Sequence, residues 1–465
     1  MTDVPAEPNR STVTDAVAVQ RVSDALWRGL DRHRGVLDVT EFGDVVLSLL
    51  YLRSLPSWQA LASRVPDIGW AIQSELSRVD EHSAVLRPLL DSVGKADEAR
   101  QLGPLVELVD RLQLPDGVLI SHVFSAMLFR IASAAGKKGG EFHTPESITD
   151  LTAALLEPAP SDRILDPCCK AGGFLAAIGD ELVRKGKSVD QLTVAISDYS
   201  TRSYALAYLN LRLRGIAPLI LPNATERLSM GAPEDRYDIV TANPPFNISN
   251  WDDNSRFAGR WQFGIPPAHN ANFAWLQYVV AALDRDGRAV VVMPQGASFS
   301  ENIQEQNIRA AMLEDGVVSA VVALPGQMFN GTDIPVTLWL LRRSPASRPY
   351  EVLFVDATGL GSVQERGRRV LGGTDIDKIV ETYRGWRQRR FDAVPGFAAG
   401  VPIGEVRDGG YRLNPRAYVA PIQSVPDLQT RARHAADLTQ RLQQLSQQAA
   451  VVDQTIEAHL KEVMP

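Results

Sequence analysis

The 465-residue chain lacks the usual marks of a secreted or membrane-spanning protein. Its only two cysteines, Cys168 and Cys169, are adjacent, which gives neither a disulfide framework nor the spacing of a zinc site. No apolar run reaches the roughly 18 residues that a membrane-spanning helix needs. The first residues also lack the charged-then-apolar pattern of a secretion signal. We therefore expect a cytoplasmic protein without a membrane contact or a bound metal, in which both cysteines fill space in the core.

The chain also lacks an excess of positive charge, because 48 lysines and arginines face 55 aspartates and glutamates, a net charge of −7. Phosphate contacts dominate the affinity of proteins that grip nucleic acid over a wide surface. The composition therefore argues against such unaided binding. Local basic groups remain, and Arg256 and Arg260 are the best candidates for contacts with phosphate. The alternative for either arginine is a solvated surface position, which is the usual place for charged side chains.

The length of the chain exceeds what one compact core usually holds, so we expect several units. The predicted organisation is a disordered polar leader over 1–14, a helical domain over 15–132, a catalytic domain over 133–422 and a C-terminal helix over 423–465. Apolar residues recur at helical spacing in the second range, as shown by Val45, Val46, Leu49, Leu50 and Leu52.

Apolar strand patterns alternate with helical patterns in the range 133–422. We predict strands at 163–165, 192–196, 219–221, 237–242, 288–293, 317–324, 336–341 and 352–355. Such alternation is typical of an α/β fold, in which helices cover both faces of a mostly parallel sheet.

Behind the predicted strand 237–242 stands the motif Asn243, Pro244, Pro245 and Phe246, whose makeup suits methylation of an amino group. The carboxamide oxygen of Asn243 and the carbonyl of Pro244 can accept both hydrogens of an amine, which frees its lone pair for a methyl donor. The prolines fix φ and hold the carbonyls rigidly. Phe246 offers a flat face to a base rotated out of its helix. The alternative is a structural turn with Phe246 in the core.

A cofactor site is predicted upstream, where a strand at 163–165 leads into a loop that begins at Asp166 and contains Gly172 and Gly173. Glycines between a parallel strand and a helix let the backbone approach a ligand closely. After the next strand, Asp198 is placed to accept hydrogen bonds from ribose hydroxyls. Asn223 follows the third strand and could meet the adenine edge of the same cofactor.

With these motifs in this order, the chain resembles the modification subunits of type I restriction-modification systems, which are adenine-N6 DNA methyltransferases. The resemblance extends over nearly the whole length. It includes residues 26–27, 42–47, 51–53, 139–145, 261–264, 270–273, 324–325, 329, 331–332, 411–415 and 418.

The resemblance implies a Rossmann-like S-adenosylmethionine-dependent methyltransferase sheet, with an N-terminal all-helical domain and a C-terminal helical tail. It also implies that S-adenosylmethionine is the cofactor and that one segment covers its methionine end. This segment consists of Glu141, Phe142, His143, Thr144 and Pro145.

The resemblance further implies that the chain flips an adenine out of double-stranded DNA, while a separate specificity subunit chooses the sequence. It leaves room for a restriction nuclease subunit and for a second copy of this chain. A seam of apolar residues at coiled-coil spacing in the C-terminal helix suits docking of a partner; it comprises Leu438, Leu442, Leu445, Ala449, Val452, Ile456, His459 and Val463. The alternative is a helix folded back on its own domain.

The chain departs from the family pattern at five positions. Lys170 and Ala171 replace Gly-Ser or Gly-Thr, His143 replaces tyrosine, Asp198 replaces glutamate and Asn272 replaces aspartate. If position 170 needs a positive φ, the lysine costs about 1 kcal/mol. The main alternative function is therefore an assembly or DNA-binding subunit whose cofactor binding Lys170 impairs. Methyltransferases acting on protein glutamine or RNA guanine carry similar motifs, and cytosine-N4 enzymes more often have serine in place of Asn243.

Overall fold

The computed structural model describes residues 11–30, 37–63, 67–78, 85–136, 143–223, 228, 235–249, 251, 261–329, 334–343, 350–364, 367–419, 436, 438–449 and 452. Contacts divide the chain into two compact units, Met1–Val419 and Ala420–Pro465. None of the helices in these described ranges is long and apolar enough to span a membrane.

The second unit contains a helix over residues 438–449. Five members of the predicted seam are exposed in this unit: Leu438, Leu442, Leu445, Ala449 and Val452. The remaining seam positions 456, 459 and 463 lie outside the described residues. Docking of a partner on this helix stays a prediction.

The first unit begins with seven helices that share one apolar core. Asp38 caps the second of them, because its carboxylate accepts a hydrogen bond from Thr40 N at 2.7 Å. Buried residues of the core include Leu26, Leu49, Leu89 and Phe124. The helices are α1 (Ser11–Leu30), α2 (Val39–Arg53), α3 (Trp58–Ala62), α4 (Ile68–Arg78), α5 (Arg87–Glu98), α6 (Leu102–Asp110) and α7 (Ile120–Ala134).

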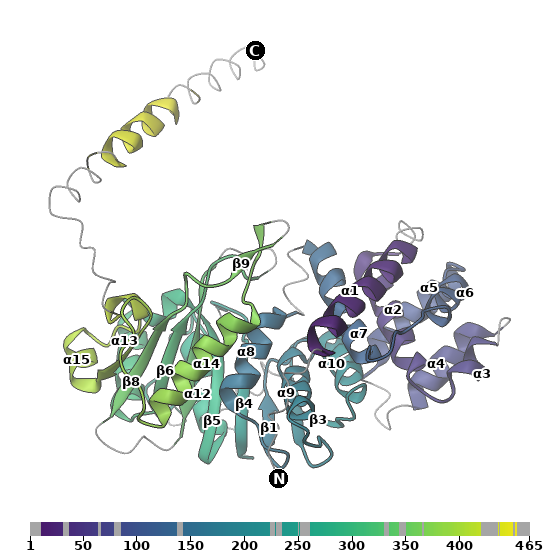
Figure 1. Ribbon diagram of the computed structural model, residues 1–465, viewed down its shortest axis with the longest axis horizontal. Helices are drawn as coiled ribbons and strands as arrows, with labels where there is room; N and C mark the ends of the chain where they lie inside the picture. The colour runs from purple at the N-terminus through teal and green to yellow at the C-terminus, as the bar shows by residue number, and fades with distance from the viewer. Residues whose placement is uncertain are drawn as a thin grey trace, which may run out of the picture. The chain divides into compact units, whose positions relative to one another are not determined.

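A nine-stranded sheet follows, in the order β11-β8-β6-β7-β5-β4-β1-β2-β3 (Figure 1). Five strand pairs are parallel, whereas β7 runs antiparallel to β5 and β6, and β11 antiparallel to β8. The strands are β1 (Arg163–Asp166), β2 (Thr193–Ile196), β3 (Pro218–Ile220), β4 (Tyr237–Ala242), β5 (Leu283–Pro294), β6 (Val318–Ala323), β7 (Val336–Arg342), β8 (Glu351–Asp356) and β11 (Ala398–Pro402). A separate hairpin pairs β9 (Ser362–Val363) with β10 (Arg369–Val370).

Alternate residues of each central strand enter different cores, as expected when both faces of a sheet are covered. Ile164 and Ile239 join one cluster, whereas Leu165 and Val240 join the other. The first cluster includes residues of α8 (Glu146–Leu156), α9 (Gly173–Arg184), α10 (Thr201–Arg212) and α14 (Gly373–Arg387). The second includes residues of α12 (Asn272–Ala282), α13 (Ile303–Glu314) and α15 (Ile403–Asp408).

The predicted α/β class is confirmed, and each of the eight predicted strands is present. Strand β5 begins at Leu283 rather than at residue 288. Strand β11 was not predicted, because its sequence Ala-Ala-Gly-Val-Pro has only one β-branched residue and ends in proline. The glycine and proline are accommodated because β11 is an edge strand paired only with β8.

Helix α10 connects the N-terminal helices to the sheet. Its residues Leu206 and Leu209 belong to the core of helices α1–α7, whereas Ala207 and Leu211 belong to a core of the sheet. Arg202, also in α10, donates from Nε to Asp44 of α2 at 2.8 Å. Asp44 is 3% exposed, so this ion pair is largely removed from water. The predicted domain boundary at 132/133 remains a prediction.

We expect Arg202→Met to lower the free energy of unfolding by roughly 2–3 kcal/mol at pH 8, because it leaves a buried carboxylate without its partner. Burial already raises the pKa of Asp44, and Arg202 opposes this rise. Without Arg202, Asp44 can bind a proton in the folded state at low pH, so the loss should be smaller at pH 5 than at pH 8. Thermal unfolding of the wild type and of Arg202→Met at both pH values measures this loss of stability.

Arg87→Met is the matched control. Arg87 pairs with Asp91 on one exposed helix face at 3.1 Å, with both side chains more than half exposed, and such pairs contribute little. Equal effects of the two substitutions at both pH values would contradict the assigned role of the buried pair.

Candidate active site

The loop after β1 has the backbone conformation expected of a ligand-binding turn. Gly172 has φ +76°, and a Cβ atom there would lie 3.3 Å from Cα of Ala207 in α10. Gly172 therefore permits close packing of the loop on that helix. Lys170 has φ +52°, so the condition on which the expected cost of a lysine depends, a positive φ, is met at this position. The loop ends at Gly173, where α9 begins.

Asp198 connects this loop to the neighbouring strand β2. Its Oδ2 accepts from Lys170 N at 2.8 Å, and its Oδ1 accepts from Ser200 N at 3.0 Å. The side chain is fully buried. The carboxylate thus stabilises the left-handed turn at Lys170, and its predicted contact with ribose stays a prediction. Asn223 is exposed and donates from Nδ2 to the carbonyl of Tyr199 at 3.3 Å.

Asp166 lies at the end of β1 and is fully buried. Its Oδ1 accepts from Cys168 N at 3.1 Å, whereas its buried Oδ2 lies near Thr241 but has no partner within hydrogen-bond geometry among the described residues. Burial raises the pKa of Asp166 to about 7, and the hydrogen bond from Cys168 N opposes this rise. Both Cys168 and Cys169 are buried free thiols, which confirms their predicted place in the core. Burial also raises the pKa of each thiol.

The motif Asn243 to Phe246 lies at the same edge of the sheet, since β4 pairs in parallel with β1 and both strands end there. Asn243 is 2% exposed, and its Nδ2 donates to Oγ1 of Thr144 at 3.0 Å. Asn247 has φ +56°. Asn272 of α12 holds this residue by accepting from its backbone N–H at 3.1 Å and donating to its Oδ1 at 2.9 Å.

Phe246 is half-buried and meets the ring of Phe329 edge to face, with centroids 6.4 Å apart and planes at 75°. The two rings come from the ends of β4 and from the loop after β6. Phe329 thus restricts where the Phe246 ring can lie.

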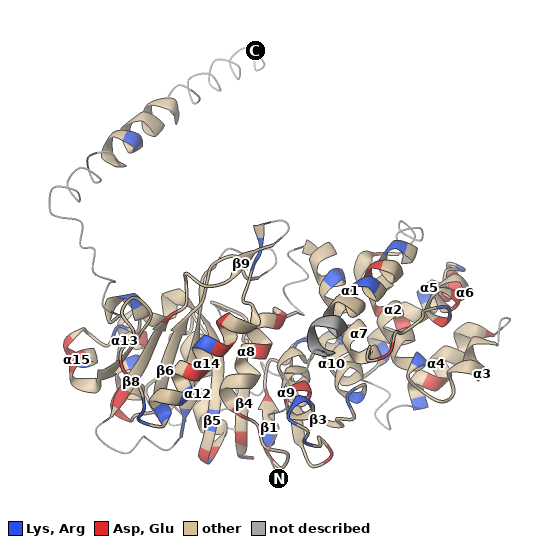
Figure 2. Cartoon of the chain, viewed as in Figure 1, with Lys and Arg blue, Asp and Glu red and all other residues tan. Residues whose placement is uncertain are grey.

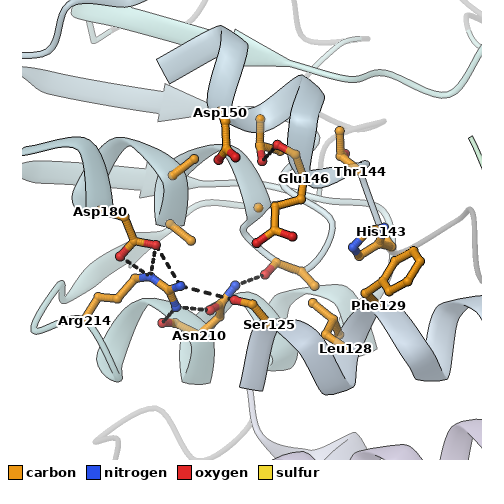
Figure 3. A pocket seen from close by; sticks show the side chains of 15 residues that line it. Ser125, Leu128, Phe129, His143, Thr144, Glu146, Asp150, Asp180, Asn210 and Arg214 are labelled. Atoms are coloured by element: carbon orange, nitrogen blue, oxygen red, sulfur yellow. Dashed lines mark hydrogen bonds and ion pairs between the residues drawn. The ribbon is translucent and has the colours of Figure 1, made fainter. Parts of the chain in front are cut away.

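His143 and Thr144 line a pocket between α7, α8, α9 and α10 (Figure 3). Burial and the nearby charges of Arg368 and Lys170 lower the pKa of His143 to about 3, so the imidazole is neutral at physiological pH. Its ring centroid lies 5.6 Å from that of Phe129.

The carboxylates of Glu146 and Asp150 also line the pocket. Pro145 caps the start of α8.

Two residues that support the loop were not predicted. Asn210 of α10 donates from Nδ2 to the carbonyl of Ala171 at 2.8 Å. Arg214 donates to Asn210 Oδ1 at 2.6 Å, to Asp180 of α9 at 2.9 Å and to Ser125 of α7 at 3.2 Å (Figure 3). A polar residue on an otherwise apolar helix face was the available signal at Asn210.

The predicted residues Glu141, Phe142, Arg256 and Arg260 lie outside the described residues.

The raised pKa of Asp166 predicts a pH dependence of stability. The folded state retains a proton that the unfolded state loses near the ordinary value of 3.8. Stability from this group is therefore present at low pH and is lost as pH rises to about 7. Asp166→Asn is neutral throughout, so its melting temperature should gain on that of the wild type between pH 5 and pH 8. Asp190→Asn, at an exposed carboxylate, is the control. Parallel curves for wild type and Asp166→Asn would refute the assignment.

Comparison with known proteins identifies the family. The model of the N-6 DNA methylase family matches residues 116–426. The HindI methylase subunit of the type I restriction enzyme of Haemophilus influenzae is 30% identical over 345 residues, 74% of this chain and 77% of that protein. The MjaIX methylase subunit of Methanocaldococcus jannaschii is 31% identical over 318 residues, 65% of this chain and 55% of that protein.

Among solved structures, the type I restriction-modification methyltransferase subunit of Streptococcus thermophilus superposes with a TM-score of 0.71 at 20% sequence identity. The match covers 86% of this chain and 99% of that one, and it confirms the methyltransferase fold. The chain belongs to the N-6 DNA methylase family, as a methylase subunit of the type I restriction-modification kind.

Proposed function

We propose that this chain transfers a methyl group from S-adenosylmethionine to N6 of an adenine flipped out of double-stranded DNA, at sequences chosen by a separate specificity subunit. The observation that carries the proposal is the position of Asn243. Its carboxamide lies at the sheet edge beside the glycine loop, since β4 and β1 are parallel neighbours. Among the described residues, none donates a hydrogen bond to its Oδ1.

Asn243 and Pro244 would accept the two hydrogens of the target amine. An exocyclic amine is a poor nucleophile, because its lone pair is delocalised into the ring. Two acceptors, Asn243 Oδ1 and the carbonyl of Pro244, draw the amine towards a tetrahedral arrangement. Both residues are buried, so the hydrogen bonds would form where water competes little. Pro245 then keeps the turn rigid.

Phe246 would stack on the flipped adenine. Its ring is half-buried, and its edge-to-face contact with Phe329 holds it in place. Stacking of a base on an aromatic side chain contributes about 1–3 kcal/mol. This gain offsets part of the cost of removing the base from its helix.

The residues at the sheet edge suit S-adenosylmethionine. Gly172 and Gly173 allow a close backbone approach, and Asp166 Oδ2 is a buried oxygen without a hydrogen-bond partner among the described residues. His143 is neutral, so it adds no positive charge beside a cationic ligand. We assign the binding of S-adenosylmethionine to the following residues: Glu141, Phe142, His143, Thr144, Pro145, Asp166, Gly172, Gly173, Asp198 and Asn223. When bound, the cofactor supplies an electrophilic methyl group on a sulfonium.

We further propose that partners supply most of the DNA affinity. The net charge is −7, and Figure 2 shows basic and acidic residues interspersed on the elements of the first unit. Arg256 and Arg260 are assigned to phosphate, and the exposed leucines of helix 438–449 to docking of the specificity subunit. A nuclease subunit and a second copy of this chain would complete the assembly.

A second candidate, a catalytically silent assembly subunit, rests on Lys170. Its side chain stands on a left-handed turn of the cofactor loop, where the family has glycine. Its charge acts on Asp166, Asp198 and His143. The same positive charge would oppose a cationic ligand bound beside these groups.

Calorimetric titration with S-adenosylmethionine separates the two candidates. We expect the purified chain, with its specificity subunit, to bind in the micromolar range, because the neighbouring carboxylates offset the charge of Lys170. Lys170→Gly should change the affinity only a few-fold. No binding by the wild type and recovery in Lys170→Gly would instead favour the assembly subunit.

Asn243→Ala and Phe246→Ala should abolish methylation of target DNA while binding of S-adenosylmethionine persists. The first variant loses an acceptor for the amine and the second loses the stacking surface. Phe246→Tyr keeps the ring and should retain most of the activity. Transfer of radiolabelled methyl groups to DNA, in the presence of the specificity subunit, provides the measurement. Full activity in Asn243→Ala would rule out the proposed mechanism.

A further inference from the structure

We infer that Thr144 is a positioning residue for methyl transfer, because it fixes the carboxamide of Asn243 so that Oδ1, and not Nδ2, meets the target amine. The inference rests on the proposed function. Thr144 is 99 positions from Asn243 in the sequence, yet its Oγ1 accepts from Asn243 Nδ2 at 3.0 Å. The two side chains are 7% and 2% exposed.

The two ends of a carboxamide have nearly the same shape but opposite hydrogen-bonding character. The target amine presents only donors, so Asn243 is useful to it in one orientation. In that orientation Nδ2 points away from the amine and needs an acceptor of its own. Among the described residues, Thr144 Oγ1 is the acceptor that Nδ2 meets.

Loss of this acceptor has a cost that appears when the base is bound. Asn243 would then either bury an unsatisfied N–H group or rotate its Oδ1 away from the amine. A buried donor without a partner is unfavourable enough to slow a reaction on the order of ten- to a hundred-fold.

The local structure holds the Thr144 hydroxyl in place. Thr144 precedes Pro145, whose carbonyl accepts from Ile148 N at 2.9 Å and Thr149 N at 3.1 Å at the start of α8. Ile148 is fully buried, so this end of the helix is packed in the core. The branched Cβ of threonine further restricts χ1.

Thr144 also lines the pocket beside the glycine loop, where Figure 3 shows it next to His143. It therefore stands between the cofactor loop and the base-binding turn. A contact with the cofactor and the positioning of Asn243 predict different effects. The first changes the affinity for S-adenosylmethionine, whereas the second changes the rate of transfer at saturating cofactor.

The test uses Thr144→Val, which removes the hydroxyl and keeps the shape, in the full chain with its specificity subunit and target DNA. At saturating S-adenosylmethionine we expect the single-turnover rate of methyl transfer to fall about ten- to a hundred-fold, a larger change than any change in the calorimetric Kd for the cofactor. Thr144→Ser restores the hydroxyl and should recover most of the rate.

Thr152→Val is the matched control. Thr152 lies in α8, the helix that begins two residues after Thr144; it is fully buried, and its hydroxyl has no hydrogen-bond partner among the described residues. This variant should keep the wild-type rate, which shows that a buried threonine on α8 tolerates valine. Weaker cofactor binding with an unchanged rate in Thr144→Val, or no change in either quantity, would overturn the inference. Failure of the proposed function would appear separately, as an inactive wild type or an active Asn243→Ala.

Discussion

The parallel pairing of β1 with β4 is the constraint on which the rest of the site depends. Ile164 pairs with Ile239 and Leu165 with Val240, so the two strands end at one edge of the sheet. Parallel neighbours require a long crossover, and here α9, β2, α10 and β3 lie between them in the sequence. The pairing brings the glycine loop and the Asn243 turn together, although the two segments are far apart in the sequence.

The loops at this edge are held by buried side chains from neighbouring elements. Asp198 binds the turn at Lys170, Asn210 binds the carbonyl of Ala171, and Asn272 binds the turn at Asn247. Arg309 of α13 acts likewise on another loop, donating to the carbonyls of Tyr411 at 2.7 Å and Ser300 at 3.2 Å. Irregular segments cannot satisfy their own backbone groups. Polar side chains on helices and strand ends take over that task, which leaves the loops in one defined conformation.

The sequence predicted the features that short-range patterns determine. Apolar runs located the eight strands, and the resemblance raised the question of a positive φ at residue 170, where the structure has φ +52°. Contacts between residues that are distant in the sequence could not be predicted from such short-range patterns. The antiparallel insertion of β7 between β5 and β6 depends on pairings across the sheet. The hydrogen bond from Asn243 to Thr144 and the support from Arg214 depend on how helices pack, and no local spacing encodes either.

Helix α10 has a mechanical consequence. Its two sides are packed in different cores, and its Asn210 grips the backbone of the cofactor loop. A close-packed protein interior has low compressibility and transmits strain. Displacement of helices α1–α7 against the sheet must therefore carry α10 with it or break its packing. The position of helices α1–α7 and the conformation of the glycine loop are therefore mechanically coupled through α10.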